Sequence, residues 1–377
     1  MPAAAPTPQI TLFLCGDVMT GRGIDQVLAH PCDPAIHERY MQSALGYVEI
    51  AEERNGPIPR QADPSYIWGD ALGELQRLAP DARIINLETA VTRSEDWVGK
   101  GINYRMNPAN IACLSAARID CCALANNHVL DWGKAGLLET LDTLHAAGLK
   151  TAGAGNRRID AETPAEIALS GNRRVLVFSL GAESSGVPPE WAATDRRPGL
   201  DFLPDLSERT VEGISRRVRA TKRPEDIAVA SLHWGPNWGY EIAPEEVRFA
   251  HQLIERAGIN LIHGHSSHHP KAIEVFRGKL ILYGCGDFVN DYEGITGYEA
   301  FRGDLGLMYF PTLDAATGQL HTMRLVATQM KRFRVQRAPA ADADWLASVL
   351  DREGGRFGTW TEPGPDGRIE LRWGSPA

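Results

Sequence analysis

Five short polar clusters lie where apolar, strand-like runs end, and each contains a side chain that can bind a metal or transfer a proton. In an open α/β sheet, ligands bind at the carboxyl ends of the strands. Carboxylate and amide oxygens, together with imidazole nitrogens, are the usual ligands of divalent metals. The pattern therefore predicts an enzyme with metal-anchored acid/base chemistry. The clusters are Cys15–Asp17, Asn86–Glu88, Asn126–His128, Leu232–Trp234 and His263–His269.

The late histidine run is the most specific of these signals. His263–His269 places four histidines within seven residues, directly after an apolar run, and packing alone would not favour so many imidazoles there. Asn126–His128 follows a second apolar run, where an amide oxygen can bind a hard cation while a neighbouring imidazole faces the substrate. Two other candidates stay open, because Asp17 can cap the turn after its strand and His233 can be a hydrogen-bonded core residue.

Two further segments indicate roles at the same site. The loop Trp234–Tyr240 is rich in glycine and aromatic residues, which is typical of a pocket wall, although its tryptophans could equally cover the edge of a sheet. Asp287 follows Gly284 and Gly286, whose small size allows close backbone approach. A carboxylate at that point can orient a histidine through its second ring nitrogen, so we predict a catalytic-site role for Asp287.

The elements that must position these residues follow from hydrophobic periodicity. Strand–helix alternation comes first and strand pairs follow, which predicts a layered α/β sandwich with a second, mixed or antiparallel sheet. After about residue 337 the pattern weakens, and only a short helix over 345–350 is expected there. The expected strands are 9–15, 83–86, 119–125, 149–152, 166–170, 174–180, 227–233, 259–263, 272–276, 279–283, 305–310 and 319–327, and the expected helices are 70–78, 108–116, 134–147, 207–220 and 244–257.

Composition excludes some classes of function. The formal net charge of −9 argues against a nucleic-acid backbone as the main partner. No apolar run approaches the ~18 residues of a membrane span, and residues 1–6 carry no basic segment of a signal peptide. We therefore expect a cytoplasmic protein without a membrane anchor. The six cysteines form no Cys-x-x-Cys pair and are expected to be reduced and mostly buried.

The order of the clusters resembles that of the poly-γ-glutamate capsule biosynthesis (CapA-like) family, a branch of the calcineurin-like metallophosphoesterase superfamily. The resemblance runs from about Gln9 to about Phe310 and rests on the five clusters, in particular Gly16–Met19 and Ala125–His128. It implies a four-layer α/β/β/α sandwich with a metal site at the strand ends. We expect a catalytic domain over residues 1–336 and a C-terminal extension over 337–377.

The resemblance also implies roles for individual residues. Three departures bear on the number of ions: Val18 and Met19 stand where the superfamily carries Asp-x-His, Glu88 replaces an aspartate, and two residues separate His265 from His268. Because one ligand set loses an imidazole, we expect a single divalent ion, Ca, Mn, Mg or Zn. The implied metal ligands are Asp17, Glu88, Asn127, His233, His265 and His268, and the predicted catalytic groups are His128, His265, Asp17 and Asp287.

Three functions compete, and the sequence favours the first. The first is a peptide epimerase, similar to the lasso-peptide epimerase of the same family, which would invert the C-terminal residue of a ribosomal precursor peptide by histidine proton transfer near the ion. The alternative is a metal-dependent hydrolase, either a phosphoesterase or a glutamyl-peptide amidase of polyglutamate metabolism. The third is a non-catalytic binding protein. A peptide or polyglutamate-like substrate is expected to contact Arg22, Arg105, Trp234, Trp238 and Lys271. The oligomeric state is not predicted.

Overall fold

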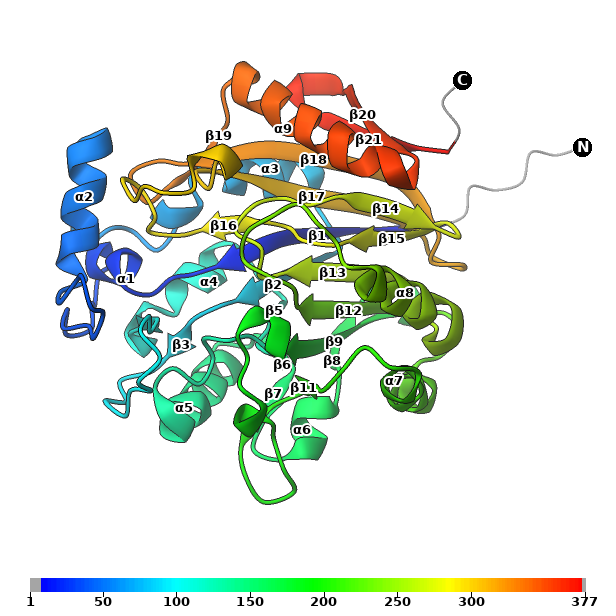
Figure 1. The fold of residues 1–377 in the computed structure, drawn as a ribbon, viewed down its shortest axis with the longest axis horizontal. Coiled ribbons are helices and arrows are strands. Elements are labelled where there is room, and N and C mark those ends of the chain that lie inside the picture. Colours follow the sequence, from blue (N-terminus) through cyan, green and yellow to red (C-terminus); the bar gives the residue numbers. More distant parts are fainter. Residues whose placement is uncertain (1–7, 375–377) are drawn as a thin grey trace, which may run out of the picture.

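The computed structural model describes residues 8–374, and its strands form two β-sheets that lie face to face between layers of helices (Figure 1). The predicted α/β/β/α sandwich is confirmed. Within the described residues, the first sheet has ten strands, in the order β20 (Thr359–Pro363), β21 (Ile369–Trp373), β18 (Leu320–Met330), β17 (Leu305–Asp314), β1 (Gln9–Val18), β2 (Ala82–Leu87), β5 (Cys121–Ala123) and β6 (Lys150–Ala152), with β16 (Asp287–Val289) beside β1 and β19 (Val335–Arg337) beside β18.

The second sheet is smaller, with seven strands among the described residues. Its order is β11 (Phe202–Leu203), β9 (Arg174–Ala182), β12 (Ile227–His233), β13 (Leu261–His265), β15 (Lys279–Leu282) and β14 (Ile273–Phe276), with β8 (Ala165–Ala168) beside β9. The predicted hairpins β8–β9 and β14–β15 are antiparallel pairs, as expected. Two further pairs of short strands join β3 (Ala90–Val91) to β4 (Arg105–Met106) and β7 (Ala154–Gly155) to β10 (Gly199–Leu200).

Helices cover the outer face of each sheet. The first sheet packs against α3 (Ala71–Leu78), α4 (Ala112–Ala116) and α5 (Gly133–Ala146). The second packs against α7 (Glu208–Thr221) and α8 (Pro244–Gln252), which continues as a π-helical turn over Leu253–Ala257. The remaining α-helices of the described residues are α1 (Gly23–Val27), α2 (Leu45–Asn55), α6 (Arg158–Glu162) and α9 (Ala340–Gly354).

Alternation along the strands explains the four layers. In β1, Leu12 and Leu14 pack between the sheets, whereas Phe13 packs beneath the helices of the first sheet. In β12, Val229 lies between the sheets and Ala230 lies beneath α7 and α8. Because each of these strands is apolar on both faces, an apolar core fills the space between the sheets and another lies beneath each helical layer.

The parallel strands deliver their carboxyl ends to one edge of the sandwich. β1, β2, β5 and β6 run parallel to one another, and so do β9, β12, β13 and β15. The two sheets meet at that edge, where Asp17 of β1 contacts the backbone of Ser266, directly after β13. β13 extends to His265, beyond the predicted end at residue 263, so His265 is a strand residue and not a loop residue.

The C-terminal part differs most from expectation. The predicted helix over 345–350 is the middle of the longer α9, and β19, β20 and β21 were not predicted. Sequence patterning is weak there because the edge strands mix polar and apolar residues on their partly exposed faces. β21 pairs with β18, and Leu350 and Leu371 lie in the core between the sheets. The division into 1–336 and 337–377 stays a prediction.

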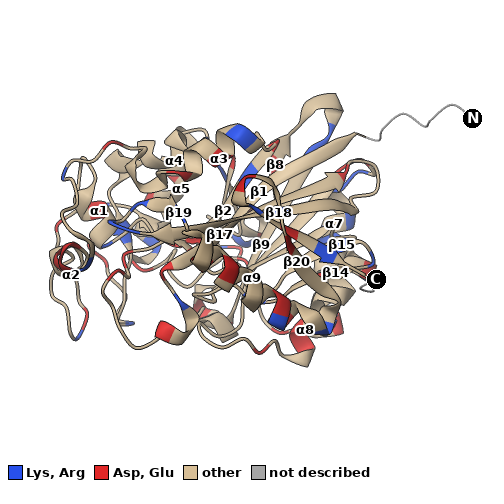
Figure 2. Ribbon diagram, turned by 90° about the horizontal axis from the view of Figure 1, so that it is seen from above, with Lys and Arg blue, Asp and Glu red and all other residues tan. Residues whose placement is uncertain are grey.

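Surface features follow the composition. Acidic and basic residues are interspersed along the helices and loops in Figure 2. None of the helices in residues 8–374 has both the length and the apolar character that crossing a bilayer requires. The expectation that no signal segment is present rests on residues 1–6, which lie outside the described residues. The six cysteines are free thiols, and all but Cys32 are buried, as predicted.

Candidate metal centre

Four polar side chains interrupt the apolar pattern at the ends of β12 and β13. Ser231 lies opposite His263 and His233 lies opposite His265 in the register of the two strands. Because side chains alternate along a strand, all four continue the face of Val229 and point toward the first sheet. All four are buried. The result is a two-by-two array of hydroxyl and imidazole groups between the sheets.

Asp17 faces this array from the first sheet. The register of β1 against β2 shifts just before Asp17, and its carboxylate accepts hydrogen bonds from Asn86 Nδ2 at 2.8 Å and from the backbone N–H of Ser266 at 3.2 Å. Its Oδ1 lies 4.0 Å from His265 Nδ1. Burial, reinforced by the Asp287 carboxylate, raises the pKa of Asp17 to about 7.

Two groups of candidate ligands share Asp17. One consists of Asp17, His233 and His265, and the other of Asp17, His268 and Asp287. In each group the ligand atoms lie within 4.8 Å of one another. The parallel pairing of β1 with β16 sets Asp17 directly opposite Asp287. A shared carboxylate between two ligand groups is the arrangement expected of a two-metal site.

The environment of the Glu88 carboxylate indicates whether these residues can bind a cation. Its carboxylate is buried, and its Oε2 has no hydrogen-bond partner among the described residues. Its Oε1 lies 3.7 Å from His128 Nε2 and 3.8 Å from His233 Nε2. Burial and the nearby Asp17 carboxylate raise the pKa of Glu88 well above its usual range. A divalent cation would relieve the repulsion between the buried carboxylates of Glu88 and Asp17 and would give Glu88 Oε2 a partner, so the donor set fits a metal ion.

Asp131 fixes the orientation of His128. Asp131 Oδ2 lies 2.6 Å from His128 Nδ1, so a neutral His128 donates its Nδ1–H to Asp131 and turns Nε2 toward Glu88. Lys100 contacts the other Asp131 oxygen at 2.7 Å and also donates to the carbonyl of Asn127. Burial lowers the pKa of His128 to about 4. His128 can therefore present a neutral Nε2 toward the centre at physiological pH.

The candidate residues lie at two depths. We call the deeper pair, His233 and His265, the floor of the centre, and the shallower set, Asn127, His128 and His268, its mouth. His233 and His265 have no exposed surface, whereas His128 and His268 each retain 8%. Asn127 is partly exposed, and its Oδ1 lies 3.2 Å from His233 Nε2. A substrate entering from solvent would therefore meet Asn127, His128 and His268 before it reached the floor.

The serines after β13 form the turn that carries His268 to Asp287. Ser266 has a φ of 97°, a conformation that side-chain-bearing residues rarely adopt. His268 Nδ1 lies 2.9 Å from Asp287 Oδ1, and its Nε2 lies 3.0 Å from Asn237 Nδ2. Burial alone would lower the pKa of His268, but Asp287 and Asp17 together raise it. Although two residues separate His265 from His268, the turn therefore still places the His268 imidazole at the centre.

Arg22, predicted to bind a substrate carboxylate, is held by the protein's own carboxylates. Its Nη2 and Nε contact Asp291 at 2.5 and 3.1 Å, and its Nη1 contacts Glu38 at 3.0 Å. The guanidinium carbon lies 3.9 Å from the centroid of the Tyr47 ring. The side chain is almost fully buried. Arg22 therefore joins the segments that carry Glu38 and Asp291, and contact between Arg22 and a substrate stays a prediction.

Three other predicted substrate-binding residues are also engaged within the fold. Arg105 Nη1 pairs with Glu95 at 2.7 Å. The Trp234 indole N–H donates to the carbonyl of Tyr283 at 3.0 Å, and its ring packs in the core beneath α7 and α8. Lys271 is buried, and that burial lowers its pKa. All three side chains have partners or packing within the fold, and contact between them and a substrate stays a prediction.

Trp238 is the predicted substrate-binding residue that lies beside the mouth. Its ring stacks on Tyr298 with 4.0 Å between centroids, and it lies 5.2 Å from the His268 ring. Tyr298 is 52% exposed. Contact between Trp238 and a substrate stays a prediction.

Sequence reasoning missed four residues of the site. Lys100 lies in a loop far from His128 in the chain, and nothing local marks it. The spacing of Asp131 from His128 is a signal that could have been used, and so is the alternation that puts Ser231 on the same face as His233. His263 belongs to the predicted histidine run, but the run alone indicates no separate role for it.

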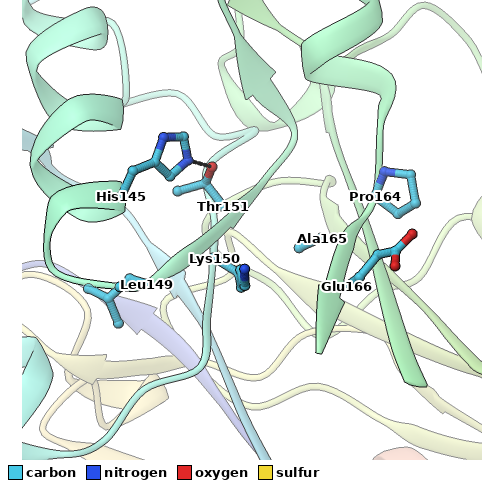
Figure 3. Close-up of a pocket in the computed structure, with 8 residues that line it drawn as sticks. His145, Leu149, Lys150, Thr151, Pro164, Ala165 and Glu166 are labelled. Atoms are coloured by element: carbon cyan, nitrogen blue, oxygen red, sulfur yellow. Dashed lines mark hydrogen bonds between the residues drawn. The ribbon is translucent and has the colours of Figure 1, made fainter. Parts of the chain in front are cut away.

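A groove elsewhere on the molecule is separate from this centre. It lies at the start of β6 and β8, where His145, Lys150, Thr151, Pro164 and Glu166 form part of its lining (Figure 3). His145 Nε2 lies 2.8 Å from Thr151 Oγ1. Because the candidate centre is at the carboxyl ends of the parallel strands, this groove occupies the opposite edge of the first sheet.

Comparison with known proteins identifies the family. The family described as "Bacterial capsule synthesis protein PGA_cap" matches residues 11–292. A "Probable polyglutamine synthesis accessory protein" of Mycobacterium tuberculosis is 48% identical over 364 residues, which cover 96% of each chain. "PGA biosynthesis protein CapA" of Bacillus subtilis is 28% identical over 298 residues, covering 76% of this chain and 67% of that protein.

A crystal structure of a phosphatase from Mycoplasma pneumoniae is a distant neighbour. It has a TM-score of 0.46 and 11% sequence identity, and the match covers 89% of this chain and 96% of that one. A likeness at that level carries no conclusion about the site. The family match covers most of this chain and the mycobacterial relative covers nearly all of it. The chain therefore belongs to the PGA_cap family of bacterial capsule synthesis proteins, as the order of its polar clusters predicted.

Proposed function

We propose that this protein is a metal-dependent hydrolase that acts on a polyglutamate-like chain. The observation that carries the proposal is the pair of carboxylate–imidazole groups that share Asp17, with an oriented histidine, His128, at the mouth above them. Structural cores do not gather such a set, because buried carboxylates without a cation are costly. A metal-anchored reaction explains their convergence.

The substrate class comes from the relatives. The mycobacterial relative is named for polyglutamine synthesis and the Bacillus relative for PGA biosynthesis. Those names support the polyglutamate alternative, and they lend no support to the peptide epimerase that the sequence favours. They also match the family description, which is capsule synthesis.

Each of the two ligand groups would hold one metal ion. The chemistry that divalent ions supply at such a site is Lewis-acid polarisation and activation of a water nucleophile. Asp17, His233 and His265 would hold one ion, and His268 and Asp287 would join Asp17 in holding a second. The sequence predicts one ion, whereas the geometry offers ligands for two, so we propose two.

His128 is the proposed general acid/base. Its Nδ1–H is committed to Asp131, so the group that faces the centre is Nε2. From that position it can accept a proton from water or deliver one to the leaving group. Lys100, paired with the other oxygen of Asp131, keeps that carboxylate from turning away.

The test combines metal reconstitution with a choice of substrates. Metal-stripped protein is reloaded with Mn²⁺, Mg²⁺, Zn²⁺ or Ca²⁺ and incubated with γ-linked and α-linked glutamate oligomers and with p-nitrophenyl phosphate. Metal-dependent shortening of a glutamate oligomer, with an equivalent release of amine, supports the proposal. Phosphate release without oligomer cleavage would assign a phosphoesterase instead. Full metal occupancy with no turnover of any substrate would contradict an enzymatic role and favour a binding protein.

The same incubation in deuterated water examines the epimerase. Deuterium entering an α-carbon of a peptide that keeps its length would contradict hydrolysis and restore the first hypothesis. The matched control is the Asp17→Asn variant, which keeps the shape of the side chain but removes the charge shared by both ligand groups.

A further inference from the structure

Ser231 and His263 lie behind the metal centre, too deep to touch a substrate. Both have no exposed surface, and their neighbours on the same face, Val229 and Leu261, are apolar. Polar side chains buried in such a layer are costly unless every hydrogen-bonding group finds a partner. Their hydrogen bonds therefore indicate why they are there.

An unbroken chain of hydrogen bonds runs from the backbone of β1 to His265. His263 Nε2 lies 2.7 Å from the carbonyl oxygen of Cys15, which can only accept, so Nε2 carries the hydrogen. The Nδ1 of a neutral His263 then accepts from the Ser231 hydroxyl at 3.0 Å. The Ser231 oxygen accepts in turn from His265 Nε2 at 2.8 Å. His265 Nδ1 then carries no hydrogen, and its lone pair faces His233 Nδ1 at 2.8 Å.

The opposite direction of the chain is disfavoured. It would require a cationic His263 that donates from both nitrogens, to the Cys15 carbonyl and to Ser231. No carboxylate contacts His263 among the residues that the structure describes, so this cation would be buried without a counter-charge. The arrangement with a neutral His263 satisfies each donor and acceptor without burying a charge.

We propose that Ser231 and His263 are positioning residues that lock His265 in the tautomer whose Nδ1 carries no hydrogen and can bind a metal ion. The proposal rests on the metal centre of the proposed function. This nitrogen lies 2.8 Å from His233 Nδ1 and 4.0 Å from Asp17 Oδ1, on the side of the first ligand group. A metal-binding histidine needs a partner on its other ring nitrogen to hold its tautomer and orientation.

The chain also links the two sheets at the depth of the ligands. Cys15 belongs to β1 and lies two positions before Asp17, while Ser231, His263 and His265 belong to the second sheet. The same hydrogen bonds that select the tautomer therefore fix the position of the His265 ring relative to Asp17.

The first test measures Mn²⁺ affinity by calorimetric titration of the metal-stripped, full-length protein. Ser231→Ala removes the hydroxyl and is expected to weaken Mn²⁺ binding about 10- to 100-fold. Ser215→Ala is the matched control, because it deletes another buried serine hydroxyl. Ser215 lies on α7, and its hydroxyl donates to the carbonyl oxygen of Arg256 at 2.8 Å. That variant is expected to bind Mn²⁺ as the wild type does.

A pair of His263 variants separates hydrogen bonding from packing. His263→Gln can still donate to the Cys15 carbonyl and accept from Ser231, so it is expected to bind Mn²⁺ nearly as tightly as the wild type. His263→Leu fills similar space but cannot make either bond, and it is expected to weaken binding as much as Ser231→Ala. Equal Mn²⁺ affinity of the leucine variant and the wild type would overturn the proposal.

Nitrogen NMR of the histidine rings reads the tautomer directly, without metal. The His265 signals are assigned by their loss in His265→Gln, and hydrogen is expected on Nε2 of the metal-free wild type. Hydrogen on Nδ1 would overturn the proposal even if the ion binds. A wild type that shows the expected tautomer but binds no Mn²⁺ would instead overturn the proposed metal centre, and with it the purpose assigned to the chain.

Discussion

At the scale of single residues, His128 shows how depth and orientation decide what a side chain can do. It lies at the mouth, retains a little exposed surface, and has one nitrogen committed to Asp131. His233 and His265 have the same ring but no exposure, and they lie among the candidate ligand atoms. In the proposed function, the same residue type would transfer a proton in one place and bind a metal ion in another.

Replacing His128 by alanine is expected to lower kcat about 10²- to 10⁴-fold, because the group that would transfer the proton is removed. Metal content, measured by atomic emission on the purified variant, is expected to match the wild type, since His128 is in neither ligand group. Loss of the ion together with activity would show that His128 is a ligand and not an acid/base.

Asp17 makes the metal-free protein sensitive to pH. Its folded pKa of about 7 lies above the value of an unfolded aspartate, near 3.9, so the folded state binds the extra proton between these values. Stability of the metal-free protein is therefore expected to fall as pH rises from about 4 to about 7. The loss from this one group is on the order of 2–4 kcal/mol.

Asp17→Asn removes that dependence, because the amide cannot ionise. In urea unfolding without metal, the variant is expected to gain more stability over the wild type at pH 8 than at pH 5.5. An equal difference at the two pH values would contradict the raised pKa.

At the scale of elements, a close approach of two glycines sets the position of the second ligand group. A Cβ on Gly16 would lie 1.5 Å from the carbonyl oxygen of Gly286, so only glycine allows β1 to pass so near the segment before β16. That contact leads directly into the pairing of Asp17 with Asp287. The backbone of β1 thus places a carboxylate from each strand at the same depth.

Gly16→Ala is expected to push that segment away and to separate Asp287 and His268 from Asp17. The expected results are a lower melting temperature and fewer ions bound per chain, measured by calorimetry and by metal analysis. Gly213→Ala is the control, because its nearest neighbour would lie 4.0 Å away and an alanine in α7 should stabilise the helix by roughly 0.5–1 kcal/mol. Unchanged ion binding by Gly16→Ala would contradict the account.

Element-scale patterns also show what the sequence could predict. Apolar runs in the sequence predict the buried strands. The polar residues at the ends of these strands lie close together because parallel strands end at the same edge of a sheet. Arg22 could not be read in this way, because its partners Glu38 and Asp291 lie in loops without a periodic pattern. The same limit hid Lys100, and it made Trp234 look like a pocket residue when its ring belongs to the core.

At the scale of the whole molecule, the C-terminal region closes the edge of the sandwich. β21 adds to the first sheet through β18, and α9 places Leu346 and Leu350 in the core between the sheets. Figure 1 shows α9 beside β20 and β21 at one side of the stacked strands. Removing residues 337–377 is therefore expected to expose apolar surface and to abolish cooperative unfolding.

Leu350→Ala tests the contribution of a single α9 side chain to the stability of the fold. Leu350 is 2% exposed, so its truncation is expected to cost about 2–5 kcal/mol in urea unfolding. Ile159→Ala, at a position 61% exposed, should change stability by less than about 0.5 kcal/mol. A fragment of residues 1–336 that unfolds cooperatively and binds metal would show that the C-terminal segment is a dispensable appendage.

The ligands of the first group come from both halves of the sandwich, Asp17 from one sheet and His233 and His265 from the other. An ion held there would join the two layers directly, in addition to the apolar core between them and the hydrogen bonds from His263 to Cys15 and from Ser266 to Asp17. At a free concentration 100 times its dissociation constant it would add about 2.7 kcal/mol to the resistance against unfolding. A shortage of the metal would thus lower the stability of the fold as well as the activity. The amount of folded protein in a cell would therefore depend on the supply of the ion.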